Sequence, residues 1–128
     1  LALSKRANKI YGIEVVESCI KFAAKNKAIN KIENYIPIQS PAEKTPDSLI
    51  KNSDILILDP PRSGLHPKVI KKILSQKPKR IIYLSCNPIT LAKDYNLLKN
   101  DYQKALLLGF DFYPNTPHLE ALLVLDLK

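Results

Sequence analysis

The sequence contains few cysteines and no long apolar run, and both features limit the class of protein. No stretch of about 18 apolar residues is present to cross a bilayer, and no charged and then apolar leader resembles a signal peptide. We therefore expect a cytoplasmic protein with no membrane partner. The two cysteines, Cys19 and Cys86, belong to a Lys-rich chain without secretory features, which favours free thiols over a disulfide. No internal repeat is visible, and no metal site is expected.

The charge balance is strongly basic, with 20 Lys and Arg against 12 Asp and Glu, a net charge of +8. Such a balance suits a polyanionic partner such as nucleic acid, but scattered lysines on a solvated surface would give the same composition. The 128 residues, 45% of them hydrophobic, are enough for one folded domain with one core, which we expect to span residues 1–128.

Apolar β-branched runs alternate with amphipathic stretches, which is typical of an α/β domain with a mostly parallel sheet. The run at 54–59 lies between two carboxylates and predicts a central strand buried on both faces. The helix at 17–28 is predicted to bury Cys19, Phe22 and Ala23. The last two strands have no helix between them, which predicts an antiparallel hairpin at one edge of the sheet. The predicted strands are 9–14, 35–38, 54–59, 80–84, 105–112 and 121–126, and the predicted helices are 17–28, 67–76 and 89–99.

Four reactive or charged side chains lie at or near strand ends, where open α/β sheets bind their ligands: Glu14, Asp59, Cys86 and Glu120. Glu14 ends its strand where a carboxylate could accept hydrogen bonds from the ribose of a nucleoside cofactor. It would equally serve as an ordinary acidic residue at the start of a helix.

The segment 59–64 reads Asp-Pro-Pro-Arg-Ser-Gly, and its two prolines make a rigid, extended exit from the preceding strand. Such a loop can hold Asp59 against a planar ring, although it can also be a simple structural turn. The side chain of Arg62 is suited to a phosphate contact or to solvent.

Cys86 follows a strand and precedes Asn87 and Pro88, which are favoured at the cap and first position of a helix. A helix N-terminus favours a thiolate, so Cys86 is a candidate nucleophile, with a buried structural cysteine as the alternative. Cys19, on the apolar side of its predicted helix, is interpreted as structural.

The loop at 112–120 is rich in polar and aromatic residues and is longer than a hairpin requires. Glu120 at its end and His118 within it are rival candidates for a general base.

Together these motifs resemble the RNA uracil-5 methyltransferase family, which makes 5-methyluridine in transfer or ribosomal RNA. The matching segments are 59–62, 85–88 with Thr90, and 112–120, in the same order as in the family. The resemblance implies a Rossmann-like class I fold that uses S-adenosylmethionine to methylate carbon 5 of a uridine in RNA. It also implies that Cys86 is the nucleophile, Glu120 the base, and Glu14 and Asp59 the cofactor-binding acids.

The chain departs from the family pattern because the N-terminal strand and Gly-rich cofactor loop are missing, as are an RNA-binding barrel and a cluster of iron–sulfur cysteines. That strand would lie between the strands ending at Glu14 and Asp59, so two open sheet edges are expected. We expect one of three outcomes: residues upstream in the parent protein, direct closure of the two strands, or self-association of the truncated chain.

Two other functions compete with this one. An adenine or cytosine amino-methyltransferase can use Asp59 and the two prolines without a thiol, although an aromatic residue then usually takes the place of Arg62. A catalytically incompetent RNA-binding fragment is the second alternative.

Overall fold

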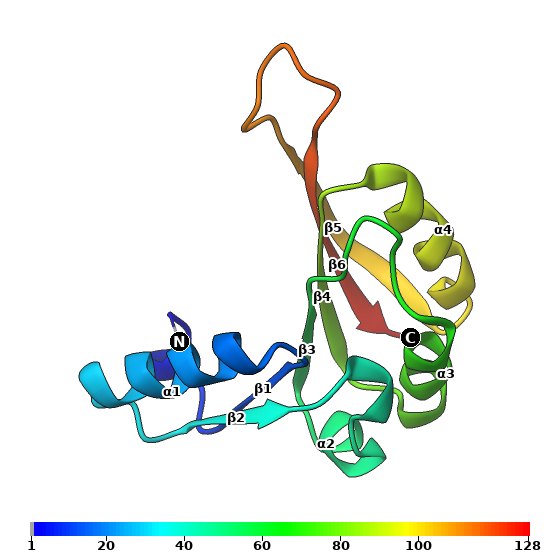
Figure 1. Cartoon of the computed structure of the whole chain (residues 1–128). Helices are drawn as coiled ribbons and strands as arrows, with labels where there is room; N and C mark the ends of the chain where they lie inside the picture. The colour runs from blue at the N-terminus through cyan, green and yellow to red at the C-terminus, as the bar shows by residue number, and fades with distance from the viewer. Residues whose placement is uncertain (1) are drawn as a thin grey trace. The chain divides into compact units, whose positions relative to one another are not determined.

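The computed structural model describes residues 2–128, and the chain divides into two compact units (Figure 1). The first unit contains two parallel strands joined by a helix, as the sequence predicts. This unit ends at Thr45. Strands β1 (Ile10–Glu14) and β2 (Tyr35–Gln39) pair in parallel, and helix α1 (Glu17–Ile29) connects them. A short 3-10 helix, η1 (Ser4–Arg6), precedes β1 in the chain, and a second, η2 (Ala42–Lys44), follows β2.

The prediction that α1 buries an apolar face is wrong. The helix has no buried residue, Cys19 is exposed, and 65% of the Phe22 side chain is accessible to solvent. A sheet of two strands is too narrow to cover the apolar stripe of a 13-residue helix. Cys19 is therefore an exposed thiol and not a core residue.

The second unit, Pro46–Lys128, contains a four-stranded mixed sheet in the order β3-β4-β6-β5. Strands β3 and β4 are parallel, while β6 runs antiparallel to both β4 and β5. The expected antiparallel hairpin at the edge of the sheet is thus confirmed. The elements of this unit are α2 (Asp47–Lys51), β3 (Ile55–Leu58), α3 (Pro67–Gln76), β4 (Arg80–Ser85), α4 (Pro88–Leu98), β5 (Tyr102–Phe110) and β6 (Glu120–Leu127).

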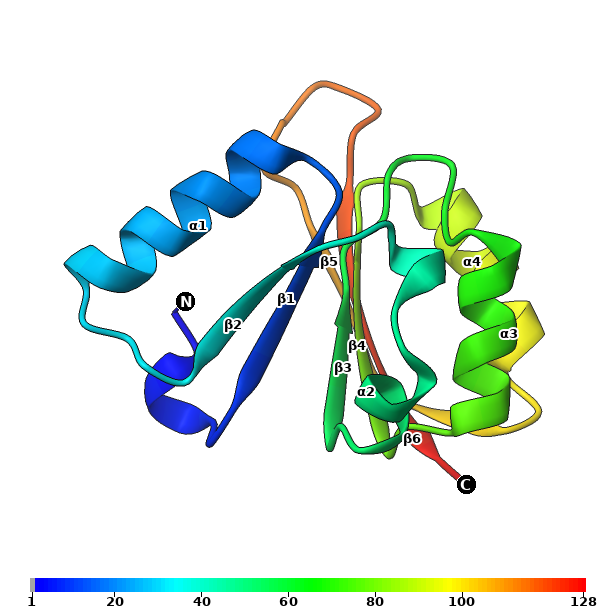
Figure 2. The ribbon, with the colours of Figure 1, turned by 60° about the horizontal axis from the view of Figure 1, so that its bottom comes forward.

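The core of this unit lies on one face of the sheet, which α3 and α4 cover (Figure 2). Buried residues of both helices pack on alternate residues of β4 and β6. The core consists of Val69, Ile70, Ile73, Ile81, Tyr83, Leu91, Leu98, Tyr102, Ala121, Leu123 and Leu125. The hydroxyl of Tyr102 donates to the Pro78 carbonyl at 2.9 Å, and burial raises the pKa of Tyr102 to about 12.

The prediction that β3 is buried on both faces is also wrong, because Ile55 and Ile57 are 50% and 46% exposed. Helices cover only the other face of this sheet, and β3 pairs only with β4 among residues 2–128. In the same part of the chain β1 pairs only with β2. Each of β1 and β3 therefore keeps one unpaired edge, as expected from the sequence, while self-association stays a prediction.

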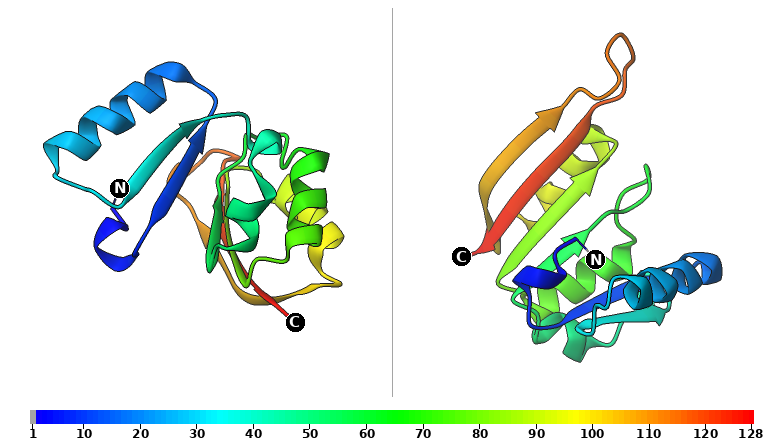
Figure 3. Two further views of the ribbon diagram at one scale, coloured as in Figure 1. Left: turned by 90° about the horizontal axis from the view of Figure 1, so that it is seen from below. Right: turned by 90° about the vertical axis from the view of Figure 1, so that its left-hand side faces the viewer.

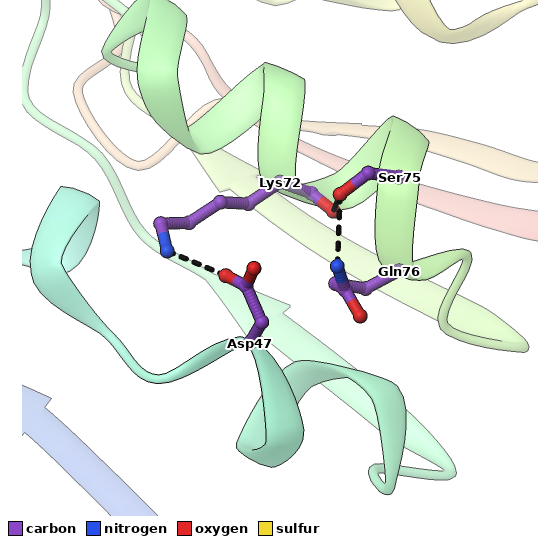
Figure 4. A network of polar contacts seen from close by, with 4 residues as sticks. All are labelled: Asp47, Lys72, Ser75 and Gln76. Carbon is purple, nitrogen blue, oxygen red and sulfur yellow. Dashed lines mark hydrogen bonds and ion pairs between the residues drawn. The ribbon is translucent and has the colours of Figure 1, made fainter.

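Helix α2 was not predicted, because Pro41 and Pro46 indicated only an interruption. An ion pair of 2.5 Å between Asp47 in α2 and Lys72 in α3 links the two helices (Figure 4). On α3 the Ser75 hydroxyl donates to the Lys72 carbonyl at 3.1 Å. The ion pair ties α2 to α3.

Candidate active site

Three loops of the second unit meet at the edge where β3 and β4 end and β6 begins. They comprise residues 59–66, 86–87 and 111–119. Parallel strands end at the same edge of a sheet, and an antiparallel neighbour begins there. Asp59, Cys86 and Glu120 are the residues at these three strand ends, so the fold gathers them at one edge.

The strand register relates Cys86 to Glu120. The ladder between β4 and β6 ends with Ser85 opposite Ala121; Cys86 directly follows Ser85, and Glu120 directly precedes Ala121. Residues opposite each other in an antiparallel pair have Cβ atoms roughly 4.5–5.5 Å apart and face the same side of the sheet. The backbone pairing therefore brings the candidate nucleophile and the candidate base to the same end of the β4–β6 pair.

A hollow of about 490 Å³ opens at this edge, on the sheet face away from the helices. Asp59 and Glu120 both line it, so two of the predicted site residues share one cavity. Cys86 is half-buried and is not among its lining residues. The remaining lining residues are Leu84, Phe110, Phe112, Tyr113, Ala121 and Leu122.

The backbone around Cys86 is fixed by its two neighbours. The Asn87 side chain accepts a hydrogen bond from the Ile89 amide at 3.1 Å, and Pro88 is the first residue of α4, so the predicted cap is confirmed. The hydroxyl of Ser85, itself buried, accepts from the Asn87 amide and donates to the Asn87 carbonyl. The sequence analysis assigned no role to Ser85.

Arg62 connects all three loops. Its carbonyl accepts hydrogen bonds from the Asn87 side-chain amide at 3.0 Å and from the Thr90 hydroxyl at 3.1 Å. Its guanidinium lies 2.5 Å from Nδ1 of His118, in the third loop. The Arg62 side chain, left between phosphate and solvent by the sequence, therefore has a protein partner. The same contact engages His118, which does not line the hollow.

A buried carboxylate holds the far end of the first loop. Asp94, in α4, is 5% exposed and accepts hydrogen bonds from the Leu65 amide at 2.8 Å and the Tyr83 hydroxyl at 2.7 Å. Burial and the bond to Asp94 hold the pKa of Tyr83 well above its usual range. The sequence analysis missed this residue, although its spacing from Leu91 and Leu98 puts an acidic group on the apolar side of α4.

Aromatic rings border the hollow. Phe110 and Phe112 stack with centroids 5.6 Å apart and ring planes 6° apart. The edge of Tyr113 meets His118 at 6.5 Å, with the planes 88° apart. The loop that carries Phe112, Tyr113 and His118 projects beyond the ends of β5 and β6 (Figure 3).

Glu14 belongs to the first unit, where its Oε1 accepts a hydrogen bond of 2.8 Å from the Val16 amide just ahead of α1. This contact matches the simpler of the two interpretations, and its role toward a cofactor stays a prediction. Within residues 2–128 no cluster of three or more His, Cys, Asp or Glu is placed to hold a metal ion. No helix of the described chain is long and apolar enough to cross a membrane.

Comparison of the sequence with known proteins points to the same family as the motifs do. A model of the family described as tRNA (uracil-5-)-methyltransferase matches residues 1–128. A tRNA (uracil(54)-C(5))-methyltransferase of Pyrococcus horikoshii is 41% identical over 92% of this chain and 28% of its own length. An uncharacterized RNA methyltransferase of Listeria innocua is 38% identical over 100% of this chain and 29% of its own length. The chain thus spans less than a third of the curated relatives that it matches.

Among solved structures, the Pyrococcus abyssi tRNA (uracil-54, C5)-methyltransferase in complex with S-adenosyl-L-homocysteine matches with a TM-score of 0.83. It is 35% identical, and the match covers 96% of this chain and 30% of that one. An rRNA methylase of Streptococcus thermophilus shares the fold, with a TM-score of 0.74 at 19% identity over 98% of this chain and 76% of that one.

Proposed function

Because this chain belongs to the tRNA (uracil-5-)-methyltransferase family, we propose that it carries catalytic residues of an S-adenosylmethionine-dependent enzyme that methylates carbon 5 of a uridine in RNA. The Rossmann-like methyltransferase fold expected from the sequence is confirmed by the matching solved structures. The observation that supports the proposal is the β4–β6 pairing, which ends with Ser85 opposite Ala121, directly beside Cys86 and Glu120. A nucleophile and a base side by side are what this reaction requires.

Cys86 starts the reaction. Carbon 5 of uracil is too weak a nucleophile to take a methyl group from a sulfonium. The Cys86 thiolate therefore adds to carbon 6, and the electrons of the carbon 5–carbon 6 double bond shift to give an enolate with a nucleophilic carbon 5. Cys86 lies directly before Asn87, the N-cap residue of α4. Ser85 and Asn87 keep the backbone of Cys86 in place.

Glu120 acts as the base in the last step of the reaction. After methyl transfer, carbon 5 still carries its proton, and a base must remove it so that the double bond re-forms and the thiolate leaves carbon 6. Glu120 lines the hollow and begins β6 next to Ala121, which is paired with the residue before Cys86. His118 is the less suitable base, because Nδ1 of its ring already contacts the Arg62 guanidinium.

S-adenosylmethionine supplies the methyl group when it is bound. Asp59 fits a role in holding it, since its exposed carboxylate enters a hollow otherwise bordered mainly by apolar and aromatic side chains. A carboxylate in such a place accepts hydrogen bonds from hydroxyl or amino groups of a ligand. Glu14 is proposed as the second cofactor-binding acid, by its position at the end of β1.

RNA, transfer or ribosomal, is the proposed partner. A net charge of +8 favours a polyanion, and the target uracil must leave its stack to reach a thiol at the edge of a sheet. Cytoplasmic location remains an expectation from the sequence. An amino-methyltransferase would have no use for a thiol and a carboxylate at the same end of the β4–β6 pair, which supports the proposal of the uracil reaction.

Covalent trapping tests the mechanism. We expect Glu120→Gln to add to uracil and transfer the methyl group but not to release the product, so that a protein–RNA adduct accumulates on a denaturing gel. Cys86→Ala should form no adduct, even with RNA containing 5-fluorouridine. Cys19→Ala, which removes the exposed thiol of α1, is the matched control and should form the adduct as the unsubstituted enzyme does. Adduct formation by Cys86→Ala would refute the nucleophile assignment. A Glu120→Gln enzyme with normal turnover would refute the base assignment.

A further inference from the structure

The stacked pair of Phe110 and Phe112 at the hollow has no part in the chemistry described above. Phe110 is the residue of β5 opposite Glu120, and Phe112 follows it into the loop. Their ring planes are nearly parallel, and both rings line the hollow. Even so, 65% of the Phe112 side chain is accessible to solvent. A flat apolar ring is thus held in a fixed orientation and left open in a hollow that also contains the carboxylates of Asp59 and Glu120.

Such a ring is ready to receive another flat ring. Contact with Phe110 restricts Phe112 before any ligand arrives, which lowers the ordering cost of binding. Unpaired nucleobases stack on aromatic side chains in this way, and every base has the necessary flat face. A base within a duplex is already covered on both faces by its neighbours.

The charges around the hollow favour the same ligand. Asp59 and Glu120 within it repel a phosphate but accept hydrogen bonds from the edge of a neutral base. Arg62, beside His118 of the projecting loop, carries a positive charge. A single-stranded nucleic acid can therefore place its base at the hollow and its backbone toward Arg62.

We propose that Phe112, ordered by Phe110, is a stacking platform that takes an unpaired nucleobase of the RNA as it enters the hollow. This assignment rests on the proposed RNA substrate and adds a residue that selects single-stranded over paired RNA. Phe112 contacts the substrate without taking part in bond making.

The test is an affinity measurement by fluorescence anisotropy with a labelled single-stranded uridine-rich RNA. It is made without S-adenosylmethionine and in a Cys86→Ala background. Phe112→Leu keeps an apolar side chain but removes the ring, and should weaken binding by at least about fivefold. Phe112→Trp restores a ring and should bind within about twofold of the parent, since stacking tolerates different aromatic partners. Phe22→Leu is the matched control, because Phe22 is equally exposed at 65% and does not line the hollow.

A second RNA makes the result specific. When the same RNA is annealed to its complement, Phe112→Leu and the parent should bind equally, because no open base remains to stack. Equal affinity of Phe112→Leu and the parent for the single strand would overturn the proposal. So would an equal loss on both RNAs, which indicates a general contact or a disturbed fold.

The failure of this proposal can be told apart from failure of the proposed reaction. One outcome is that Phe112→Leu loses affinity for single-stranded RNA while the enzyme with Cys86 intact forms no adduct with 5-fluorouridine RNA. In that case the stacking proposal is supported and the proposed uracil reaction is refuted. If the parent forms the adduct and Phe112→Leu binds as tightly as the parent, the chemistry stands and the platform is refuted.

Discussion

Replacing Gly64 by alanine should destabilise the second unit strongly, and the structure gives the reason. Gly64 has a φ of +83°, in the region that L-residues rarely adopt, and a side chain there costs roughly 1–2 kcal/mol. The new Cβ would also lie 2.7 Å from Oδ2 of Asp94. That oxygen accepts the bonds from Leu65 and Tyr83, and bonds to a charged acceptor contribute about 1.5–3 kcal/mol each.

We therefore expect Gly64→Ala to lower the free energy of unfolding by about 2–4 kcal/mol, since the carboxylate can move only by weakening one of these bonds. Urea unfolding followed by far-UV circular dichroism measures it. Gly109→Ala is the control, because its Cβ would meet Leu119 at an ordinary 3.6 Å and glycine is unfavourable within a strand. A loss below about 1 kcal/mol in Gly64→Ala would contradict both the strain and the contact with Asp94.

Three further predictions follow from single contacts. Tyr83→Phe should lower the free energy of urea unfolding by about 1–3 kcal/mol, because it removes a hydrogen bond to the buried carboxylate of Asp94; an unchanged midpoint would refute this role. Asn87→Ala should lower the free energy of unfolding by at least about 1 kcal/mol, because it removes both the cap of α4 and the bond to the Arg62 carbonyl, and Asn87→Asp should recover only the part due to the cap. Arg80→Gln should raise the pKa of Asp126, which the hydrogen bond from Arg80 now lowers, as an NMR titration of the carboxyl can show. A lowered carboxyl pKa stabilises the fold above its unfolded-state value of about 4, so the stability difference from the parent should disappear as the pH falls through the folded-state value.

Much of the fold was readable from the sequence because each element has its own local signal. The run 54–59 ends at two prolines, and β3 ends at Leu58 as that pattern requires. Helix α3 begins at Pro67 and buries Val69, Ile70 and Ile73 as its spacing predicts. Asn87 and Pro88 marked the start of α4 in the same way.

The failures concern burial, which depends on partners distant in the chain. Cys19 and Phe22 lie on the apolar side of α1, but nothing in the sequence of that helix tells whether another element covers them. Ile55 and Ile57 belong to an apolar run, yet the helices pack on the opposite face of their sheet.

The site was predicted as a set of residues but not as an arrangement. Asp59, Cys86 and Glu120 were identified by their positions at strand ends, and the sheet brings these ends together. The bonds of the Arg62 carbonyl to Thr90 and of Asp94 to the Leu65 amide were missed, because they join residues 28 and 29 positions apart through backbone groups that carry no sequence signal.

The β4–β6 pairing also decides which parts of this chain can change in length. The loop at 111–119 lies outside the ladder, so residues can be added or removed there while Glu120 keeps its place at the start of β6, beside the end of β4. Strand β5 already contains an irregularity between Lys104 and Leu106, which lets its register shift without moving β6. A single residue inserted within β6 has no such outlet, because one step of slippage turns the Glu120 side chain to the opposite face of the sheet. Natural variation in the length of this region should therefore gather in the loop and in β5, and be absent from the eight residues of β6.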